Sequence, residues 1–238
     1  MSKKLFIQIP VFNEEVSIGE VLLGIPKTIS GFDSTAVTVI NDGSTDNTLD
    51  VVRGHGVEHI VNLAINKGLG AAFRKGLNYA LANGADVIVN LDGDNQYSAQ
   101  DITKIVTPIL ENRADVVVGN RQLRLVPGYP LYKLISQSIG NFLVYAVFHA
   151  KIDDATSGFR ALNKDAARIL AEKLTNDYTY TLESLCVLLR QKMRVMFIPV
   201  NIKYPTRQSR LIKSKTYYCF NFLSILFSFI IRAKPRAT

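Results

Sequence analysis

The sequence predicts an α/β fold with a mostly parallel central sheet, and two observations lead to this prediction. Five short apolar runs, typical of buried strands, alternate with helical patterns over roughly the first 120 residues. Polar turn segments rich in glycine, asparagine or aspartate close most of these runs. Strands that alternate with helices in this way pair in parallel, because each helix carries the chain back across the sheet.

The first half of the chain supplies five expected strands and the signals that bound its helices. The strands are expected over residues 5–10, 37–41, 57–63, 86–92 and 115–119. Asn13 is the expected N-cap of the first helix, and Ser44 or Thr45 that of the second. A third helix should end before Gly84, which suits the left-handed position after a helix, and Ser98 should cap the fourth.

The second half is less regular but still reads as helices and strands. Over the whole chain, the further helices are expected over residues 66–83, 100–112, 131–148, 164–174, 181–191 and 216–231, and short strands are expected within 157–162 and 194–204. In a parallel sheet ligands bind beyond the carboxyl ends of the strands. The polar residues that follow each expected strand should therefore face one crevice, although they are scattered along the chain.

The stretch VIVNLDGDNQY, residues 87–97, places two carboxylates at the end of the fourth expected strand. Gly93 lets the backbone turn between Asp92 and Asp94, so that both carboxylates can reach one ion. Carboxylate oxygens suit Mg²⁺ or Mn²⁺, and Gln96 can add a neutral oxygen. Because Mg²⁺ completes its shell with water and phosphate oxygens, such a site implies a diphosphate ligand. A polar turn that holds no metal is the alternative.

Glycine and histidine motifs exclude several other functions. A dinucleotide fingerprint would need a third glycine where Phe73 stands, and it would have to follow the first strand. The chain also contains no G-x-x-x-x-G-K-[ST] sequence, which excludes a P-loop nucleotide site. His55 and His59 have the spacing of a zinc pair, but Gly54 and Gly56 would break a helix there. We therefore interpret both histidines as surface residues.

Six segments in this order carry a resemblance to a known family. They are IPVFNEE, VINDGSTDNT, NKGLGAAFRKGLNYA, NLDGDNQY, VVGNR and TSGFRALNK, within roughly residues 5–215. Together they resemble the family 2 glycosyltransferases of the GT-A fold, which is a Rossmann-like fold for nucleotide-diphospho-sugars. The branch they resemble most includes dolichyl-phosphate mannosyltransferase and bacterial polyprenyl-phosphate glycosyltransferases. Many relatives have aspartate where Asn41 stands.

The resemblance implies roles for individual residues. Asp42 should face the base of the nucleotide, and Asp92, Asp94 and Gln96 match the D-x-D-x-Q metal motif of the family. Catalytic roles are implied for Asp94, Arg121 and Asp154, with Asp154 expected as a structural or metal-side support rather than as a base. The residues expected around the nucleotide-sugar are Pro10, Phe12, Glu14, Asp42, Lys67, Gly68 and Asp92. For Glu14 the alternative is a charge in the first turn of a helix.

The resemblance also implies the reaction, which is inverting transfer of a mannose- or glucose-type hexose from a GDP- or UDP-sugar to a polyprenyl or dolichyl phosphate. A phosphate monoester is already an anion at neutral pH, so it needs positive charge rather than a general base. The residues expected to hold it are Arg121, Lys133, Ser136, Arg160 and Arg207. Two alternatives remain: transfer to a sugar or protein hydroxyl with Asp154 as base, and a non-catalytic protein that binds a nucleotide-sugar.

The charge of the chain is concentrated near its C-terminus. Glu183 is the last acidic residue and eleven lysines and arginines follow it, whereas the whole chain has a net charge of +8. We expect a catalytic domain over residues 1–212 and a basic and apolar helix over 213–238 that lies on an anionic membrane. Packing against a partner is the alternative for this helix, so a homo-oligomer stays open. Basic runs of the kind that bind nucleic acid are missing, so no nucleic acid is expected.

The expected location is the cytoplasmic face of the membrane. The first residues, MSKKLFIQIPVFNEE, have too short an apolar run for a signal peptide. Cys186 and Cys219 are far apart and match no metal or redox spacing, as expected in a reducing compartment. The protein should be peripheral through its C-terminal helix, or integral if the native chain continues.

Overall fold

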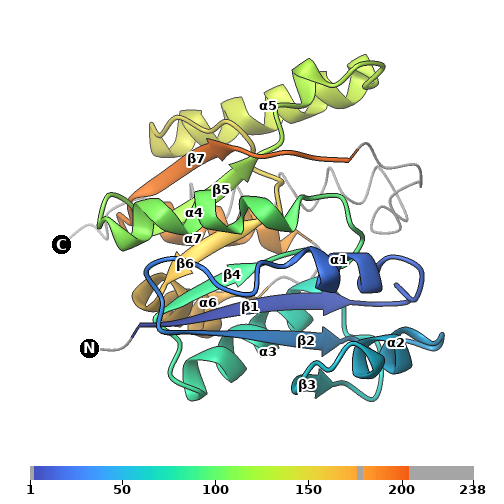
Figure 1. The fold of residues 1–238 in the computed structure, drawn as a ribbon. Coiled ribbons are helices and arrows are strands. Elements are labelled where there is room, and N and C mark those ends of the chain that lie inside the picture. The colour runs from blue at the N-terminus through green and yellow to red at the C-terminus, as the bar shows by residue number, and fades with distance from the viewer. Residues whose placement is uncertain (1–2, 176–178, 204–238) are drawn as a thin grey trace.

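The centre of the computed structural model is one seven-stranded sheet (Figure 1). The structure describes residues 3–175 and 179–203. The strands are β1 (Lys4–Val11), β2 (Ser34–Asn41), β3 (His59–Asn62), β4 (Val87–Asn90), β5 (Val116–Asn120), β6 (Arg160–Asn163) and β7 (Val195–Pro199). Their order in the sheet is β3-β2-β1-β4-β6-β5-β7.

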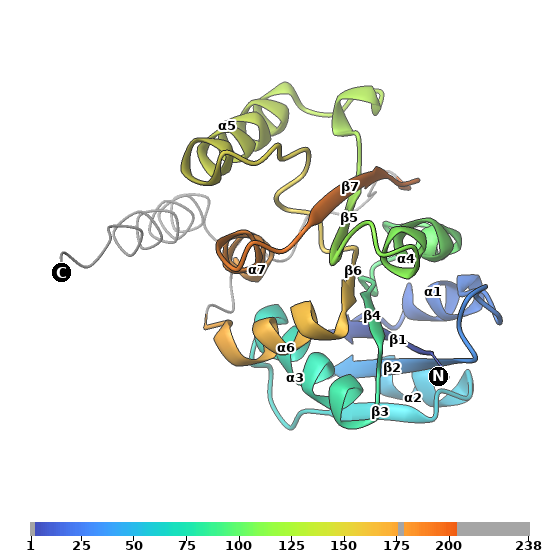
Figure 2. The same cartoon turned by 90° about the vertical axis from the view of Figure 1, so that its left-hand side faces the viewer.

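Helices cover both faces of this sheet (Figure 2). They are α1 (Ile18–Gly24), α2 (Thr48–Gly54), α3 (Leu69–Ala82), α4 (Ile102–Leu110), α5 (Leu131–Phe148), α6 (Lys164–Lys173) and α7 (Tyr180–Arg190), with short 3-10 turns η1 (Ala99–Asp101) and η2 (Leu123–Leu125). Helices α1, α2 and α4 supply the core of one face, and α3, α6 and α7 that of the other. Helix α5 packs against α7 at one end of the molecule.

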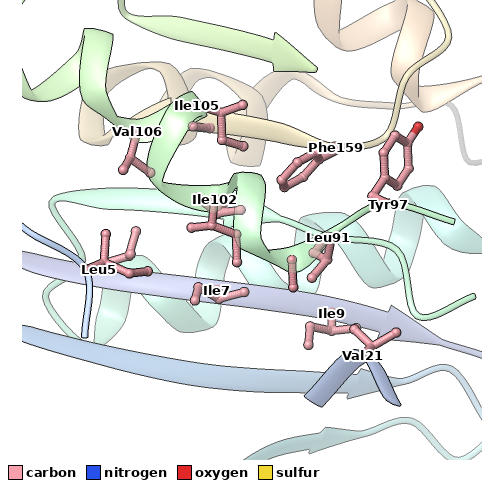
Figure 3. Packing of buried hydrophobic residues seen from close by; sticks show 14 of the residues in the cluster. Leu5, Ile7, Ile9, Val21, Leu91, Tyr97, Ile102, Ile105, Val106 and Phe159 are labelled. Atoms are coloured by element: carbon pink, nitrogen blue, oxygen red, sulfur yellow. The ribbon is translucent and has the colours of Figure 1, made fainter. Parts of the chain in front are cut away.

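The alternation of side chains along β1 shows why the sequence forms this sheet. Leu5, Ile7 and Ile9 point to one face, where they pack under Ile102 of α4 (Figure 3), whereas Phe6 points to the other. All five side chains are fully buried. Because burying one such side chain stabilises the fold by about 1.5–3 kcal/mol, the alternation of β1 fixes its register between the two helical layers.

One strand breaks the parallel pattern, and it does so next to the polar strand ends. Strand β6 pairs antiparallel with both β4 and β5, whereas all other pairs are parallel. Its first residue, Arg160, stands opposite Asn90 at the end of β4. The segment that leads into β6 therefore lies at the same edge of the sheet as the carboxyl ends of the parallel strands. The sequence predicted this short strand but not its direction.

The expected strands and helices that fall within the described residues are confirmed, but three of the helix caps are wrong. Asn13 has a left-handed backbone (φ 55°), and α1 begins only after Ser17. Helix α2 is preceded by Asn47 rather than by Ser44 or Thr45. Ser98 precedes the 3-10 turn η1, and its side chain makes no cap hydrogen bond. The first two predictions were wrong because the side chains of Asn13 and Ser44 accept hydrogen bonds from each other's loops instead of from the helix that follows each of them.

Gly84 follows α3 with φ 81°, as expected for the left-handed residue after a helix.

Several sequence predictions lie outside the described residues: Arg207, the helix over 213–238 and the side chain of Ser136. In the described part of the chain, no helix combines the length and the apolar character that crossing a membrane requires.

Candidate active site at the carboxyl edge of the sheet

Two loops that follow β1 and β2 are tied to each other by hydrogen bonds. The backbone N–H of Asn13 donates to Ser44 Oγ (2.9 Å), and the N–H of Thr45 donates to Asn13 Oδ1 (2.8 Å). The N–H of Glu14 donates to Thr48 Oγ1 (2.8 Å). The left-handed backbone of Asn13 lets its side chain and its amide face the same neighbouring loop. The loops expected to surround the nucleotide thus form one unit.

Asp42 fastens a third loop to this unit. Its two carboxylate oxygens accept hydrogen bonds from the backbone N–H groups of Lys67 and Gly68, both at 2.8 Å. Gly43 allows the close approach, because a Cβ on it would lie 2.6 Å from the backbone nitrogen of Asn66. The sequence prediction that Asp42 contacts the base is not tested by these bonds. They show that the carboxylate, which belongs to a residue only 3% exposed, has a structural role as well.

The residues expected near the nucleotide differ in exposure. Pro10 is buried at the end of β1, Glu14 is half-buried, and Lys67 is exposed on the loop that Asp42 holds. Phe12 is exposed to 38%, which is unusual for an aromatic residue just after a central strand. Phe12, Glu14 and Lys67 lie on segments that follow parallel strands, as expected, whereas Pro10 still belongs to β1.

The carboxylate of Asp92 lies just beyond β4 and has a buried oxygen that lacks a partner. Among the described residues, Oδ1 of Asp92 is buried and accepts no hydrogen bond. Gly158 lies against the same carboxylate: a Cβ on this glycine would stand 2.6 Å from Oδ2 and 2.8 Å from Oδ1 of Asp92. Burial, and then the charge of Asp94, raise the pKa of Asp92 to about 7. A carboxylate in this position fits a divalent cation, which would supply the missing partner.

Asp94 and Gln96 continue the same turn at the surface. Asp94 is exposed, and its Oδ1 accepts the backbone N–H of Gln96 at 3.0 Å. The described residues contain no cluster of three or more histidine, cysteine, aspartate or glutamate side chains that could hold a metal ion. A cation at Asp92 and Asp94 would therefore need oxygens from water and from a bound ligand, as Mg²⁺ sites for nucleotides generally do.

Ser17 links this turn to the loop after β1. Its hydroxyl lies 2.7 Å from Oε2 of Glu14 and 2.9 Å from the carbonyl oxygen of Gly93. The hydroxyl carries one hydrogen, so it donates to one of these acceptors at a time. The side chain of Glu14 is in this way positioned between the nucleotide loops and the Asp92 turn.

Arg121, which directly follows β5, forms a two-point ion pair with Asp154. Its Nε donates to Oδ2 of Asp154 and its Nη2 to Oδ1, both at 2.8 Å, and Nη2 also donates to Thr156 Oγ1 at 2.6 Å. The Asp154 side chain is fully buried and that of Arg121 is 14% exposed. Although burial alone would raise it, the pKa of Asp154 is lowered, because the Arg121 charge and its hydrogen bonds stabilise the carboxylate. Asp154 is therefore a poor proton acceptor in this structure.

Arg160 lies beneath the site rather than on its surface. It is fully buried, and its guanidinium donates to the carbonyl oxygens of Ala155 (3.2 Å) and Ser157 (2.8 Å) and to Ser184 Oγ. The expectation that Arg160 contacts the acceptor phosphate does not suit this placement, because the guanidinium is enclosed by protein. These bonds instead hold the backbone on both sides of Thr156, which contacts Arg121.

Lys133, the next expected acceptor contact, is exposed near the start of α5, and its Nζ lies 5.9 Å from the centre of the Tyr129 ring. The structure thus brings Arg121, Asp154 and the Asp92 turn to one edge of the sheet. It places Lys133 on helix α5, which follows in the chain, and it buries Arg160 below these residues.

Several residues with a role in this geometry carried little signal in the sequence. Tyr97 reads as an ordinary core aromatic, but its hydroxyl accepts the N–H of Gly158 and lies 3.3 Å from Ser157 Oγ. Gly158 could have been noticed, because a glycine ahead of a short strand often marks close approach of another group. Asn141 of α5 bonds to the carbonyl of Asp153 and to the N–H of Ala155, a contact that only the fold reveals.

Comparison with known proteins agrees with this arrangement. Residues 6–170 match the family described as "Glycosyl transferase family 2". An uncharacterized protein of Methanocaldococcus jannaschii is 31% identical over 84% of this chain and 82% of its own length. A UDP-N-acetylglucosamine–dolichyl-phosphate N-acetylglucosaminyltransferase of Methanococcus voltae is 28% identical over 85% of this chain and 86% of its own length.

The fold is also similar to that of a solved enzyme. Glucosyl-3-phosphoglycerate synthase from Mycobacterium tuberculosis, crystallised with Mn²⁺, UDP and glucosyl-3-phosphoglycerate, superposes with a TM-score of 0.74. The superposition covers 96% of this chain and 80% of that one, at 16% sequence identity. At this identity the likeness concerns the fold alone.

Proposed function

The chain belongs to glycosyl transferase family 2, and from this premise we propose that it transfers a hexose from a UDP- or GDP-sugar to a polyprenyl or dolichyl phosphate, with inversion at the anomeric carbon. The observation that carries the proposal is the Asp92 carboxylate, with its buried and unpartnered oxygen, at the carboxyl edge of the sheet beside Asp94. Asp92, Asp94 and Gln96 would hold Mg²⁺ or Mn²⁺. The similar enzymes named above are the further support, since one is named for a dolichyl phosphate and another was crystallised with Mn²⁺ and UDP.

The donor half of the reaction requires that a diphosphate leave with a growing negative charge. When bound, a divalent cation would supply charge stabilisation for that leaving group. The chain itself contributes position: Asp42 and the bonds around Asn13 hold three loops in one unit beside the Asp92 turn. Glu14, reached by Ser17, lies between those loops and that turn. Phe12 offers an exposed ring on which a base can stack.

The acceptor half requires a nucleophile, and a phosphate monoester with a second pKa of about 6 is one without losing a further proton. The protein then needs to position an anion, not to deprotonate it. The Arg121 guanidinium is held in place by Asp154 and Thr156 through Nε and Nη2. Its Nη1 takes no part in these bonds and is the donor that we assign to the acceptor phosphate. Lys133 adds positive charge on the adjacent helix.

Transfer to a hydroxyl is the weaker alternative. It needs a carboxylate that accepts a proton, and Asp154 is fully buried against Arg121 with a lowered pKa. A non-catalytic sugar-nucleotide binder is weaker still, because binding alone does not explain an arginine that Asp154 holds in place close enough for its charge to act on Asp92.

The test is a transfer assay. UDP-glucose, UDP-N-acetylglucosamine and GDP-mannose would each be supplied with Mn²⁺ or Mg²⁺ and a short polyprenyl phosphate, and labelled lipid would be measured. We expect labelled lipid with one of the donors and none with the corresponding polyprenol, which lacks the phosphate. Labelling of the polyprenol or of a sugar hydroxyl instead would favour the hydroxyl alternative, and no turnover of any donor would favour a binding protein.

A further inference from the structure

Three buried polar side chains form a row across the sheet, below the turn that carries Asp92. Gln8 of β1, Asn90 of β4 and Arg160 of β6 are all fully buried. The three strands are neighbours in the sheet, and Asn90 stands opposite Gln8 in one pairing and opposite Arg160 in the other. Residues that stand opposite each other on paired strands point to the same face of the sheet. The row therefore lies within one helical layer of the core, two residues before Asp92.

Hydrogen bonds join Gln8 and Asn90 into a chain with a fixed direction. Nε2 of Gln8 donates to the carbonyl oxygen of Phe73 in α3 (3.3 Å) and to Oδ1 of Asn90 (3.0 Å). Nδ2 of Asn90 donates to the carbonyl oxygen of Gly158 (2.9 Å). Because a backbone carbonyl only accepts hydrogen bonds, both ends of the chain require an amide nitrogen. The chain thus runs from α3 through β1 and β4 to Gly158.

Gly158 is the residue that this chain holds against Asp92. A Cβ on Gly158 would stand 2.6 Å from the Asp92 carboxylate, so the two groups are in close contact. The hydroxyl of Tyr97 accepts the N–H of Gly158 (3.3 Å), and Nε of Arg160 donates to the carbonyl oxygen of the preceding residue (2.8 Å). Together with the bond from Asn90, these contacts fix the peptide groups on both sides of Gly158.

Asn90 also acts on the Asp92 carboxylate itself. Burial, and then the charge of Asp94, raise the pKa of Asp92. The charges of Arg121 and Arg160 and a hydrogen bond from the Asn90 side chain oppose this rise in pKa. Oδ1 of Asp92 nevertheless has no partner among the described residues. The amide of Asn90 therefore holds the carboxylate and its neighbour Gly158 while Oδ1 stays open to an ion.

The stability of the core does not account for these amides. Oε1 of Gln8 is buried, and no group in the described part of the chain donates to it. A buried polar atom in this state costs about 1–3 kcal/mol, whereas apolar groups in place of both partners of a buried hydrogen bond can be nearly neutral. An apolar pair at these two positions would avoid that cost. What the amides provide is the fixed position of the groups above them.

We propose that Asn90, braced by Gln8, is a positioning residue for the cation site: it holds Gly158 and the Asp92 carboxylate at the spacing that leaves Oδ1 open to the ion. The inference rests on the proposed function in one respect, which is that Asp92 binds a divalent cation. It adds that the affinity for this cation is set from inside the sheet as well as by the ligands.

The substitution Asn90→Val tests this role, since valine is similar in size and suits a strand but donates no hydrogen bond to Gly158. The full chain, freed of metal, would be titrated with Mn²⁺ and followed by electron paramagnetic resonance. We expect the Mn²⁺ affinity to fall by about tenfold or more, which is the effect usual for groups that orient metal ligands. Urea denaturation would confirm that the variant folds.

Thr38→Val is the matched control. Thr38 of β2 is fully buried and stands opposite Gln8, and its hydroxyl has no partner among the described residues. The substitution therefore also replaces a buried polar side chain by valine in the same layer of the core, but it breaks no bond to Gly158. We expect the Mn²⁺ affinity of Thr38→Val to equal that of the natural chain.

A double variant separates positioning from general loosening of the core. Asn90→Val and Gly158→Ala should both displace the same carboxylate, so their effects should not be independent. We expect the double variant to lose less Mn²⁺ affinity than the product of the two single losses. Losses that multiply in full would show that Asn90 acts elsewhere and would overturn the inference.

Two further results would also overturn it. One is natural Mn²⁺ affinity in Asn90→Val, which would leave the proposed cation site intact and remove only the role of Asn90. The other is an equal loss of affinity in Thr38→Val, which would assign the effect to the core as a whole. If the natural chain itself binds no Mn²⁺, the proposed cation site fails and this inference fails with it, so the two failures are told apart by the natural chain.

Discussion

Asn141 of α5 holds the backbone on both sides of Asp154, donating to the carbonyl oxygen of Asp153 (2.8 Å) and accepting the N–H of Ala155 (3.1 Å). Asp154 in turn fixes Arg121 through two hydrogen bonds. The chain of contacts therefore runs from a surface helix to the guanidinium that we assign to the acceptor. It connects residues at the end of β5, in the loop before β6 and in the middle of α5.

The Arg121–Asp154 pair should contribute strongly to stability. Asp154→Asn leaves the buried guanidinium without its counter-ion, and breaking a buried pair in this way costs about 3–5 kcal/mol of unfolding free energy. Urea denaturation measures the loss. Asp153→Asn is the matched control, because that neighbouring side chain is 31% exposed and pairs only loosely with Lys151; we expect a change within about 0.5 kcal/mol. Equal stabilities for the two variants would contradict a structural role for Asp154.

The pH dependence of transfer should reflect the acceptor and not Asp154. The pKa of Asp154 is lowered, so this group stays ionised across the neutral range and adds no limb to the profile there. The acceptor phosphate loses its second proton with a pKa of about 6, so with saturating Mn²⁺, which keeps Asp92 ionised although its pKa is raised to about 7, kcat/KM should rise to a plateau as pH increases through about 6. A rising limb that moves with Asp154→Asn would show that the aspartate acts as a base.

Gly158 should be required for cation binding although its φ does not lie in the left-handed region. In Gly158→Ala the new Cβ would meet the Asp92 carboxylate at 2.6 Å, so the carboxylate must move. We expect Mn²⁺ affinity, measured by electron paramagnetic resonance, to fall by about tenfold or more, which corresponds to about 1.4 kcal/mol. Gly54→Ala is the control, since nothing lies within 4 Å of a Cβ there. Unchanged Mn²⁺ affinity in Gly158→Ala would remove this glycine from the site.

Acid should weaken the link between β5 and β7. Asp115 accepts from the backbone and side chain of Arg194, and these hydrogen bonds lower the pKa of Asp115. A carboxylate with a lowered pKa stabilises the fold above its unfolded pKa of about 3.9, and this stability is lost as pH falls through the folded value. The melting temperature of Asp115→Asn should therefore be lower than that of the natural chain near pH 6, with the gap closing as pH falls below the unfolded pKa. A difference in melting temperature that does not change with pH would contradict the lowered pKa of Asp115.

The sheet could be predicted from the sequence because its signals are local. The apolar run that ends in Asp92 and the left-handed Gly84 each act within a few residues, and both are found as expected. The contacts that shape the site join residues far apart in the chain, such as Gly158 and Asp92 or Asn141 and Asp153. Asn13 shows why local sequence is not enough to predict such contacts. Its polar side chain suits a helix cap, but in the fold it bonds to a neighbouring loop instead.

Arg160 shows that the role of a charged residue also cannot be predicted from the sequence alone. The sequence places an arginine in TSGFRALNK, and only the fold reveals that it is fully buried between two carbonyl oxygens and Ser184. An arginine in a motif is equally suited to a bound phosphate and to buried backbone oxygens. Burial decides between them, and burial depends on how β6 enters the sheet.

The central claim is that Asp92 and Asp94 hold a divalent cation against the diphosphate of a sugar donor. The most direct measurement is a crystal grown with Mn²⁺ and UDP or GDP, with data collected at a wavelength where manganese scatters anomalously. We predict one strong anomalous peak within bonding distance of the Asp92 or Asp94 carboxylate and of a diphosphate oxygen. A nucleotide bound at the strand ends with the manganese peak elsewhere, or with none, would contradict the account.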